Sequence, residues 1–267
     1  MTGLIIAILG AGEMASGVAH RLFRSGFVRI VMSEIPAPLA VRRLVCFSEA
    51  VYTGTAEVEG VRAELARDPA GVRAIWDRRT IVVLVDEEAS FLRSIEPDVL
   101  IDATMVKRPK GSVKGFAPKA RLVIGVGPGF RAPDQVDAVI ESNRGHHLGR
   151  VIYTGEAEAF TGIPGAVMGA TLSRVLRAPH EGKVRPVRAI GDIVKKGDVA
   201  LYVDKTPIEA AIDGVLRGLI RPMAVQDNEK LGDVDPNGDV GRCAAISDKA
   251  RAIAGGALEA VMHRFNG

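Results

Sequence analysis

Two glycines near the start of the chain have a spacing that suits phosphate binding. The stretch LIIAILGAGEMASGVAHRL, residues 4–22, carries the pattern G-x-G-x-x-A after an apolar run. Gly10 permits a tight turn, Gly12 lets a phosphate approach the backbone, and Ala15 lets a helix pack closely on a strand. Backbone amides at the start of a helix bind a diphosphate well. The pattern predicts a dinucleotide or related nucleotide, with an unliganded turn as the alternative. The predicted binding residues here are Gly10, Ala11, Gly12, Glu13, Met14 and Ala15.

A carboxylate follows at the distance expected of a ribose contact. Glu34 lies 22 residues after Gly12, about where an acidic side chain bonds the adenosine ribose of NAD. A carboxylate there disfavours the 2′-phosphate of NADP, although Arg42 and Arg43 would soften that preference. NAD or NADP is the predicted cofactor.

Other unusual residues follow later apolar runs. In an open parallel sheet, ligands bind beyond the carboxyl ends of the strands, where such residues gather. The segment GVGPGF either presents amides to an anion or only turns the chain out of a strand. The further predicted cofactor-binding residues are Asp102, Thr104, Gly125, Gly127 and Gly129.

Four side chains are candidates for catalysis, each with a plainer alternative. A histidine of the adjacent pair His146 and His147 would act as a general acid or base, since histidine titrates near neutral pH. Lys107 belongs to the basic loop MVKRPKGSVKG, which is either solvated or faces an anionic ligand. Cys243 precedes the last predicted helix, where a thiol pKa can be lowered; the alternative is a small buried residue. The spacing of histidines, cysteines and carboxylates predicts no metal site.

The elements that must position these residues alternate in the first half of the chain. Apolar runs predict strands, and PAGVRAIWDRR and EEASFLRSI between them read as helices. YTGTAEVEGVRAEL interrupts the alternation and predicts a hairpin or edge strands. This order predicts a Rossmann-like, doubly wound parallel sheet. The predicted strands are residues 4–9, 28–32, 81–85, 99–101, 122–126 and 136–140.

The sequence pattern changes after about residue 155, where glycine and proline separate short apolar runs. APHEGKVRPV is similar to AAIDGVLRGL, and IGDIVKKGDV to VQDNEKLGDV, which indicates a duplicated β module. The pattern resembles the biotinyl/lipoyl-like barrel-sandwich hybrids, in which a hairpin lysine carries a group. Lys205 lies near that place, with a solvated turn lysine as the alternative.

Three segments are therefore expected. Residues 1–154 form the nucleotide-binding domain, residues 155–246 the small β domain, and residues 247–267 a helix that packs on the first domain. Ser247 or Asp248 would cap that helix, because a short side-chain oxygen accepts from the amides of the first turn.

Composition narrows the class of protein. The 267 residues carry a net charge of +3 and no basic run with interleaved aromatics, which argues against nucleic acid. No apolar stretch approaches the roughly 18–20 residues of a membrane span, and a signal peptide is not expected. Only two cysteines make a disulfide framework unexpected. The expected location is the cytoplasm, and a homo-oligomer stays open.

Nine segments in one order carry a resemblance that extends from Gly10 to Val261. They are GAGEMASGVAHRLFRSGF, EIPAPLAVRR, SEAVYTG, GVGPGF, ESNRGHHLGRVI, TGIPG, IGDIVKKGDV, AIDGVLRGLIR and AISDKARAIAGGALEAV. Together they resemble the YqeB-like proteins, a family labelled as selenium-dependent molybdenum hydroxylase system proteins. That family is loosely similar to the XdhC-type chaperones, which have a Rossmann domain.

The resemblance implies an accessory protein for maturation of a molybdenum hydroxylase. Its partners would be that hydroxylase or its maturation machinery, and molybdopterin would be a transient ligand beside a small-molecule nucleotide. Cys243 would then handle sulfur or selenium. Two alternatives stay open: an NAD(P)-dependent oxidoreductase acting on a small acidic substrate, and a non-catalytic nucleotide-binding adaptor. The family brings no agreed catalytic residues.

Overall fold

The chain divides into two compact units. A computed structural model describes residues 3–88, 90–105, 113–117, 119–160 and 168–266. Unit 1 comprises Met1–Pro38, Cys46–Phe160 and Ile246–Gly267, and unit 2 comprises Leu39–Val45 and Thr161–Ala245.

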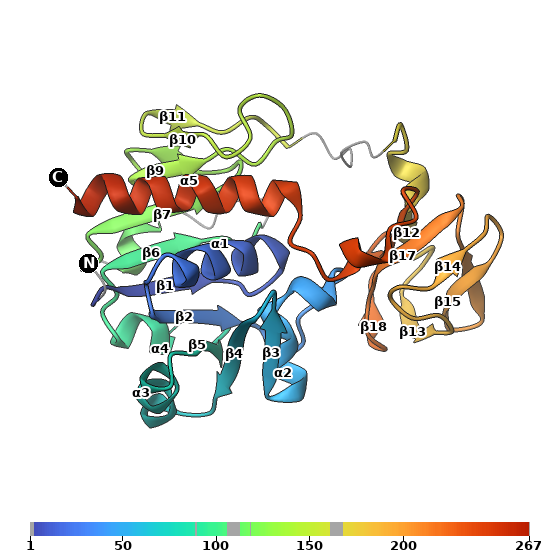
Figure 1. Ribbon diagram of the computed structural model, residues 1–267, viewed down its shortest axis with the longest axis horizontal. Coiled ribbons are helices and arrows are strands. Elements are labelled where there is room, and N and C mark those ends of the chain that lie inside the picture. The colour runs from blue at the N-terminus through green and yellow to red at the C-terminus, as the bar shows by residue number, and fades with distance from the viewer. Residues whose placement is uncertain (1–2, 89, 106–112, 118, 161–167, 267) are drawn as a thin grey trace. The chain divides into compact units, whose positions relative to one another are not determined.

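A nine-stranded sheet forms the centre of unit 1, in the order β10-β9-β7-β6-β1-β2-β5-β4-β3 (Figure 1). The strands from β9 to β4 run parallel, and an antiparallel strand closes each edge. The strands are buried Val, Ile, Leu and Ala runs, as expected where both faces are covered. Their bounds are β1 Ile5–Leu9, β2 Arg29–Glu34, β3 Thr55–Val58, β4 Val61–Ala66, β5 Ile81–Val85, β6 Val99–Asp102, β7 Leu122–Val126, β9 Ala138–Ile140 and β10 Val151–Ile152.

Two helices lie side by side over this sheet, α1 (Glu13–Arg24) and α5 (Asp248–Phe265) (Figure 1). Their contact needs a residue without a side chain, because a Cβ on Gly17 would lie 2.9 Å from the Cβ of Ala250. The first turn of α5 therefore lies beside the early part of α1, although more than 200 residues separate them in sequence. The shorter helices are α2 (Ala50–Thr53), α3 (Pro69–Asp77) and α4 (Ser90–Ser94).

The alternation of strands and helices that is predicted for a doubly wound sheet is interrupted by the β3–β4 hairpin and does not continue beyond β6. Among the described residues between β6 and β9, regular structure is limited to the 3-10 turn Lys114–Phe116, β7 and β8 (Arg131–Ala132). β8 pairs with β11 (Gly155–Glu156) in a small separate sheet. The predicted hairpin is confirmed as β3 and β4 at the sheet edge. In the described part of the chain, no helix is long and apolar enough to cross a membrane.

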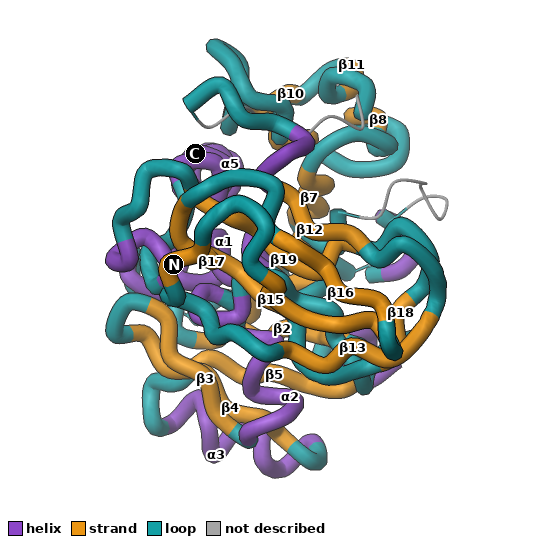
Figure 2. The backbone as a smooth tube through the Cα atoms, turned by 90° about the vertical axis from the view of Figure 1, so that its right-hand side faces the viewer, coloured by secondary structure: helices purple, strands orange, loops and turns teal. Residues whose placement is uncertain are grey.

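Unit 2 consists of two four-stranded antiparallel sheets, β12-β19-β17-β14 and β16-β15-β13-β18 (Figure 2). A core of small aliphatic side chains, such as Val194, Leu216 and Val234, lies in this unit. The strands are β12 Val175–Arg177, β13 Gly182–Pro186, β14 Ile193–Val194, β15 Val199–Val203, β16 Thr206–Glu209, β17 Gly214–Leu219, β18 Ala224–Val225 and β19 Lys230–Asp235.

A segment from the first part of the chain belongs to unit 2. Leu39–Val45 packs on β17, where the Leu219 N–H donates to the Val41 carbonyl at 2.9 Å. A Cβ on Gly218 would lie 2.8 Å from Val41, so the approach depends on that glycine. The sequence had placed this segment in a continuous first domain, because nothing local distinguishes it from its neighbours.

Candidate functional site

The turn between β1 and α1 lies at the carboxyl end of the parallel strands. Gly10 has φ +87°, in the left-handed region that favours glycine, and a Cβ there would lie 3.3 Å from the Cα of Thr104. Its N–H donates to the Ser33 carbonyl at 2.8 Å. The Ala11 carbonyl accepts from the Ser16 hydroxyl and the Ser48 N–H, both at 2.9 Å. Hydrogen bonds from neighbouring segments therefore hold the turn in place.

The start of α1 has no side-chain cap. Gly12 occupies the N-cap position, whereas Asp68 caps α3 and Ser247 caps α5 with side-chain oxygens. Of the two residues predicted to cap α5, Ser247 is the cap, with its oxygen 3.2 Å from the Ala250 nitrogen, and Asp248 lies in the first turn. Gly12 has φ −69°, which any residue adopts, and a Cβ there would meet no atom within 4 Å. The packing around Gly12 therefore gives no steric reason for a glycine, and the N-cap position is its only internal role.

Glu34, the predicted ribose ligand, braces the turn instead of standing free. Its Oε2 accepts from the Ala11 N–H at 2.8 Å, and its Oε1 accepts from the Ile35 N–H at 2.9 Å. The side chain is half-buried. Each carboxylate oxygen retains acceptor capacity, so the geometry permits a further hydrogen bond from a ligand hydroxyl.

Asp102 also serves its own strand end. Its Oδ1 accepts from the N–H of Thr104 at 3.1 Å and from the Thr104 hydroxyl at 2.7 Å. Thr104 is exposed at the same edge, across from Gly10.

Internal packing accounts for two of the three glycines at the end of β7 and just after it. A Cβ on Gly125 would lie 2.4 Å from the ring of Phe130. The N–H of Gly127 donates to the Ile140 carbonyl at 2.8 Å, and a Cβ there would lie 2.8 Å from the Ser142 hydroxyl. Gly129 has φ +100°. The GVGPGF segment therefore has the geometry of a turn out of the strand, the plainer of its two predicted roles.

A charged group that sequence reasoning missed lies beside the start of α1. Lys249 is half-buried in the first turn of α5 and interacts electrostatically with Glu13, Glu141 and Arg144. Burial lowers its pKa, the positive charge of Arg144 lowers it further, and neighbouring carboxylates offset this only in part. Within the described residues its ammonium makes no hydrogen bond or ion pair.

Hydrogen bonds and an ion pair hold the loop between β9 and β10, which contains Glu141 and Arg144. Glu141 is buried, and its two carboxylate oxygens accept from the N–H groups of Asn143 at 2.6 Å and Glu158 at 2.7 Å. Arg144 forms a two-pronged ion pair with Asp248. A lysine in the first turn of a helix opposes the helix dipole, and this was the one signal in the sequence that pointed to Lys249.

The predicted catalytic residues are not brought together. His146 and His147 are exposed in the loop before β10, not in a strand. Lys107 lies outside the described residues. Among the described residues, no group of three or more His, Cys, Asp or Glu side chains is placed to hold a metal ion.

Cys243 lies in unit 2 and is buried. It ends the 3-10 turn Val240–Cys243, and its Sγ lies 3.8 Å from the Leu216 carbonyl oxygen. Burial raises the pKa of its thiol, against the lowering by Arg42 and Arg217. This is the environment of the small buried residue and not of an activated nucleophile.

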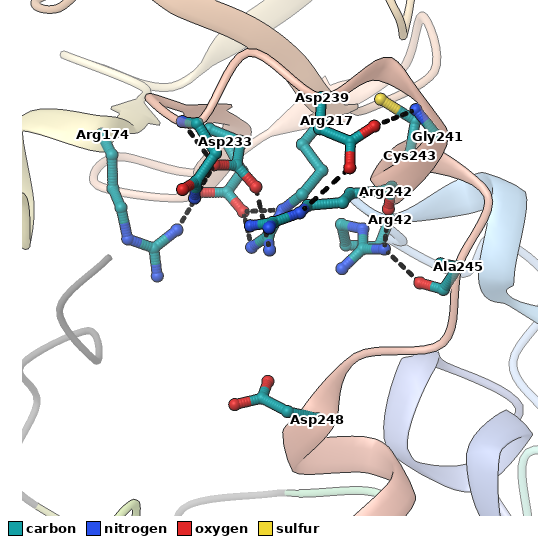
Figure 3. A network of polar contacts seen from close by, with 12 residues as sticks. Arg42, Arg174, Arg217, Asp233, Asp239, Gly241, Arg242, Cys243, Ala245 and Asp248 are labelled. Atoms are coloured by element: carbon teal, nitrogen blue, oxygen red, sulfur yellow. Dashed lines mark hydrogen bonds and ion pairs between the residues drawn. The ribbon is translucent and has the colours of Figure 1, made fainter. Parts of the chain in front are cut away.

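A buried network of ion pairs lies near Cys243 in unit 2 (Figure 3). Asp233, 1% exposed at its side chain, forms ion pairs with Arg174 and Arg217, and the Arg217 Nε lies 3.1 Å from its Oδ2. Burial acts to raise the pKa of Asp233, but Lys230, Arg217 and Arg174 outweigh it and hold that pKa below its usual range. Arg42 donates to the carbonyls of Arg242 at 2.9 Å and Ala245 at 2.8 Å. Lys205 lies apart from these groups, exposed in the turn between β15 and β16.

Comparison with known proteins gives one strong sequence match. No protein-family model matches the chain. Over 259 residues, 97% of its length, the chain is 44% identical to YqeB of Escherichia coli (strain K12), a protein described as uncharacterized. The chain spans 47% of that relative, about half its length. This match supports the resemblance to YqeB-like proteins.

Solved structures match only distantly. A succinylglutamate desuccinylase/aspartoacylase from Rhodobacter sphaeroides is 22% identical with a TM-score of 0.23, covering 32% of this chain and 30% of that one. An aspartoacylase family protein from Mesorhizobium loti is 14% identical with a TM-score of 0.27, covering 87% and 85%. The Escherichia coli tRNA N6-threonylcarbamoyladenosine dehydratase TcdA is 11% identical with a TM-score of 0.34, covering 100% and 89%.

These findings correct the predicted fold class and function. The matching structures are of desuccinylase/aspartoacylase type and TcdA, not of a Rossmann-like NAD(P)-binding domain joined to a barrel-sandwich hybrid. The chain is a mixed α/β protein with a large, mostly parallel sheet. A strand, a glycine turn and a helix are local features common to many such folds, so they do not specify the remaining topology.

The predicted role in molybdenum hydroxylase maturation, with its oxidoreductase and adaptor alternatives, is corrected together with the fold class. The solved structures that match are described as desuccinylase/aspartoacylase-type proteins and an ectoine utilization protein. Function depends on the site and not on family association. NAD, NADP, molybdopterin, the partners, the oligomeric state and the cytoplasmic location stay predictions.

Proposed function

We propose that unit 1 binds a small phosphate-bearing ligand on the Gly10–Gly12 turn, with Lys249 neutralising its charge. The observation that carries the proposal is Gly12, a glycine that no neighbouring atom requires. Its backbone angles are ordinary and the space beside it is open, at the uncapped start of α1. A side chain is absent where a ligand phosphate would approach the backbone.

The backbone supplies the first part of this binding. The hydrogen bonds of α1 begin with Ser16 N–H donating to the Gly12 carbonyl at 2.8 Å, so the amides of the first turn of α1 have no acceptor within the helix. These amides and the helix dipole favour an anion, and hydrogen bonds to charged groups contribute roughly 1.5–3 kcal/mol each.

Lys249 supplies the second part. A half-buried ammonium with no ion pair among the described residues is costly, because burial disfavours the charged form. An anionic ligand beside Glu13 would offset that cost. The half-buried Glu34 and the exposed Thr104 supply oxygens at the same strand ends for hydroxyls of the ligand.

Substitution of Gly12 with alanine tests the proposal directly. Gly12→Ala meets no atom within 4 Å, so the fold should lose only about 0.5–1 kcal/mol, from the poorer N-cap. The added methyl group should weaken binding at least tenfold, because it displaces phosphate from the amides. Calorimetric titration with pyrophosphate, AMP, NAD and NADP measures this.

Gly255→Ala is the matched control. Gly255 also has open space around it and lies within α5, so alanine there should leave binding unchanged. Equal binding by the Gly12→Ala variant and the wild type, or no binding by the wild type to any of the four ligands, would contradict the proposal.

A further inference from the structure

The tip of the β3–β4 hairpin holds a glutamate in a backbone conformation that glutamate rarely adopts. Glu59 has φ +44° and Gly60 has φ +77°, and these two residues form the whole turn between Val58 and Val61. Two positive φ angles are typical of a hairpin turn that prefers asparagine or aspartate followed by glycine. The strain at Glu59 requires a compensating interaction.

That interaction is made by the glutamate carboxylate. Glu59 Oε1 accepts from the Ile246 N–H at 2.8 Å and from the Arg251 guanidinium at 2.5 Å. Its carbonyl oxygen lies 3.4 Å from Nε2 of His20 on α1. The exposed hairpin tip therefore contacts three places: α1, Ile246 and the first turns of α5. Ile246 is the residue at which the chain returns to unit 1.

The two contacts on α5 bracket Lys249. Ile246 precedes the Ser247 cap, Arg251 lies on the next turn, and Lys249 stands between them in sequence. We propose that Glu59 is a positioning residue, a latch that fixes the first turn of α5 against α1 and so holds the Lys249 ammonium beside the Gly10–Gly12 turn. The positioning role rests on the proposed function, whereas the latch itself does not.

The test compares Glu59→Ala with Glu57→Gln, an exposed glutamate on the same hairpin that makes none of these contacts. Backbone amide hydrogen exchange of residues 246–250 should accelerate roughly tenfold in Glu59→Ala and stay unchanged in Glu57→Gln. Pyrophosphate affinity, measured by calorimetry, should fall about three- to tenfold in Glu59→Ala only.

A double-mutant cycle separates positioning from a general loss of structure. In a Lys249→Met background, Glu59→Ala should cause no further loss of pyrophosphate affinity, because the group that it positions is absent. Additive losses would overturn the positioning role. Glu59→Asn, which tolerates the positive φ but is too short for the contacts, should reproduce Glu59→Ala if the contacts are what matters.

The two proposals fail differently. Unchanged exchange at residues 246–250 in Glu59→Ala overturns the latch, whatever the ligand results. If the wild type binds none of pyrophosphate, AMP, NAD and NADP, the proposed function is overturned and the positioning role with it, while the exchange experiment still decides on the latch.

Discussion

The two units treat buried charge in opposite ways. In unit 2, Asp233 is almost completely buried and forms ion pairs with Arg174 and Arg217. In unit 1, Lys249 is half-buried and has no ion pair within the described residues. A buried charge is costly unless it is paired, so the charges of unit 2 are explained by one another. Glu13, Glu141 and Asp248 act on Lys249 only as neighbouring charges. Under the proposed function, an anionic ligand would form the missing ion pair.

Glycines can likewise be divided into those that neighbouring atoms require and those that they do not. Gly125 in unit 1 and Gly218 in unit 2 are required by neighbours, since a Cβ would lie 2.4 Å from the Phe130 ring and 2.8 Å from Val41, respectively. Gly12 has no such neighbour. A residue that internal packing explains is poor evidence of a binding site, and a residue that it leaves unexplained is better evidence. This distinction favours Gly12 over Gly10, Gly125 and Gly127, which also lie at strand ends.

The largest effect is expected in unit 2, where Asp233→Ala leaves two arginines without their buried partner. Removing one partner of a buried pair costs about 3–5 kcal/mol of unfolding free energy. Hydrogen exchange of β17 and β19 during urea titration measures the loss within unit 2. Lys195→Ala is the control, because its ion pair with Asp213 is exposed and should change little. A loss in Asp233→Ala no larger than in the control would break the comparison.

Lys249→Met should affect binding rather than folding. A charge-assisted hydrogen bond contributes roughly 1.5–3 kcal/mol, so pyrophosphate affinity should fall about 10- to 100-fold. The thermal midpoint should stay the same or rise, because the variant removes a half-buried charge. Lys205→Met, at an exposed turn of unit 2, should leave both affinity and midpoint unchanged. A lower midpoint with unchanged affinity would show that Lys249 is structural.

The smallest predicted effect is the dependence of stability on pH, which should differ between the two units. Burial lowers the pKa of His20, with Arg251 and Arg24 lowering it further, against the contacts with Glu59. A histidine with a lowered folded pKa binds fewer protons than the unfolded chain does, so unit 1 should lose stability as pH falls below about 6.5. Asp233, whose pKa is held low, keeps its contribution in that range.

Hydrogen exchange at pH 7 and pH 5 should show β1 and α1 losing protection while β17 and β19 keep theirs. His20→Gln should remove most of the change in unit 1. An equal response in both units would contradict the assignment to His20.

Local patterns predicted most of the strands and helices of unit 1. The apolar runs at residues 4–9, 81–85 and 122–126 became β1, β5 and β7, since an unbroken run of Val, Ile and Leu is stable only inside a covered sheet. The hairpin at the sheet edge and the Ser247 cap were equally readable, because turns and caps depend on a few adjacent residues. These elements did not specify the fold class, and they did not specify the function.

The candidate site was predicted only in part. The Gly10–Gly12 turn was identifiable, whereas the roles of Gly125 and Gly127 in packing were not, because Phe130 and Ser142 contact them only in three dimensions. The burial of Cys243 also depends on β17, far from it in sequence. Lys249 left a weak local signal, an unfavourable charge at a helix start.

By itself the sequence determined where strands, turns and helix caps form, since each depends on side chains within a few positions of one another. Only the tertiary structure decided that the chain segment Leu39–Val45 joins unit 2, that α5 lies beside α1, and that the strained Glu59 holds the first turn of α5. These are contacts between residues distant along the chain. Their formation depends on the packing of whole elements, which no local pattern records.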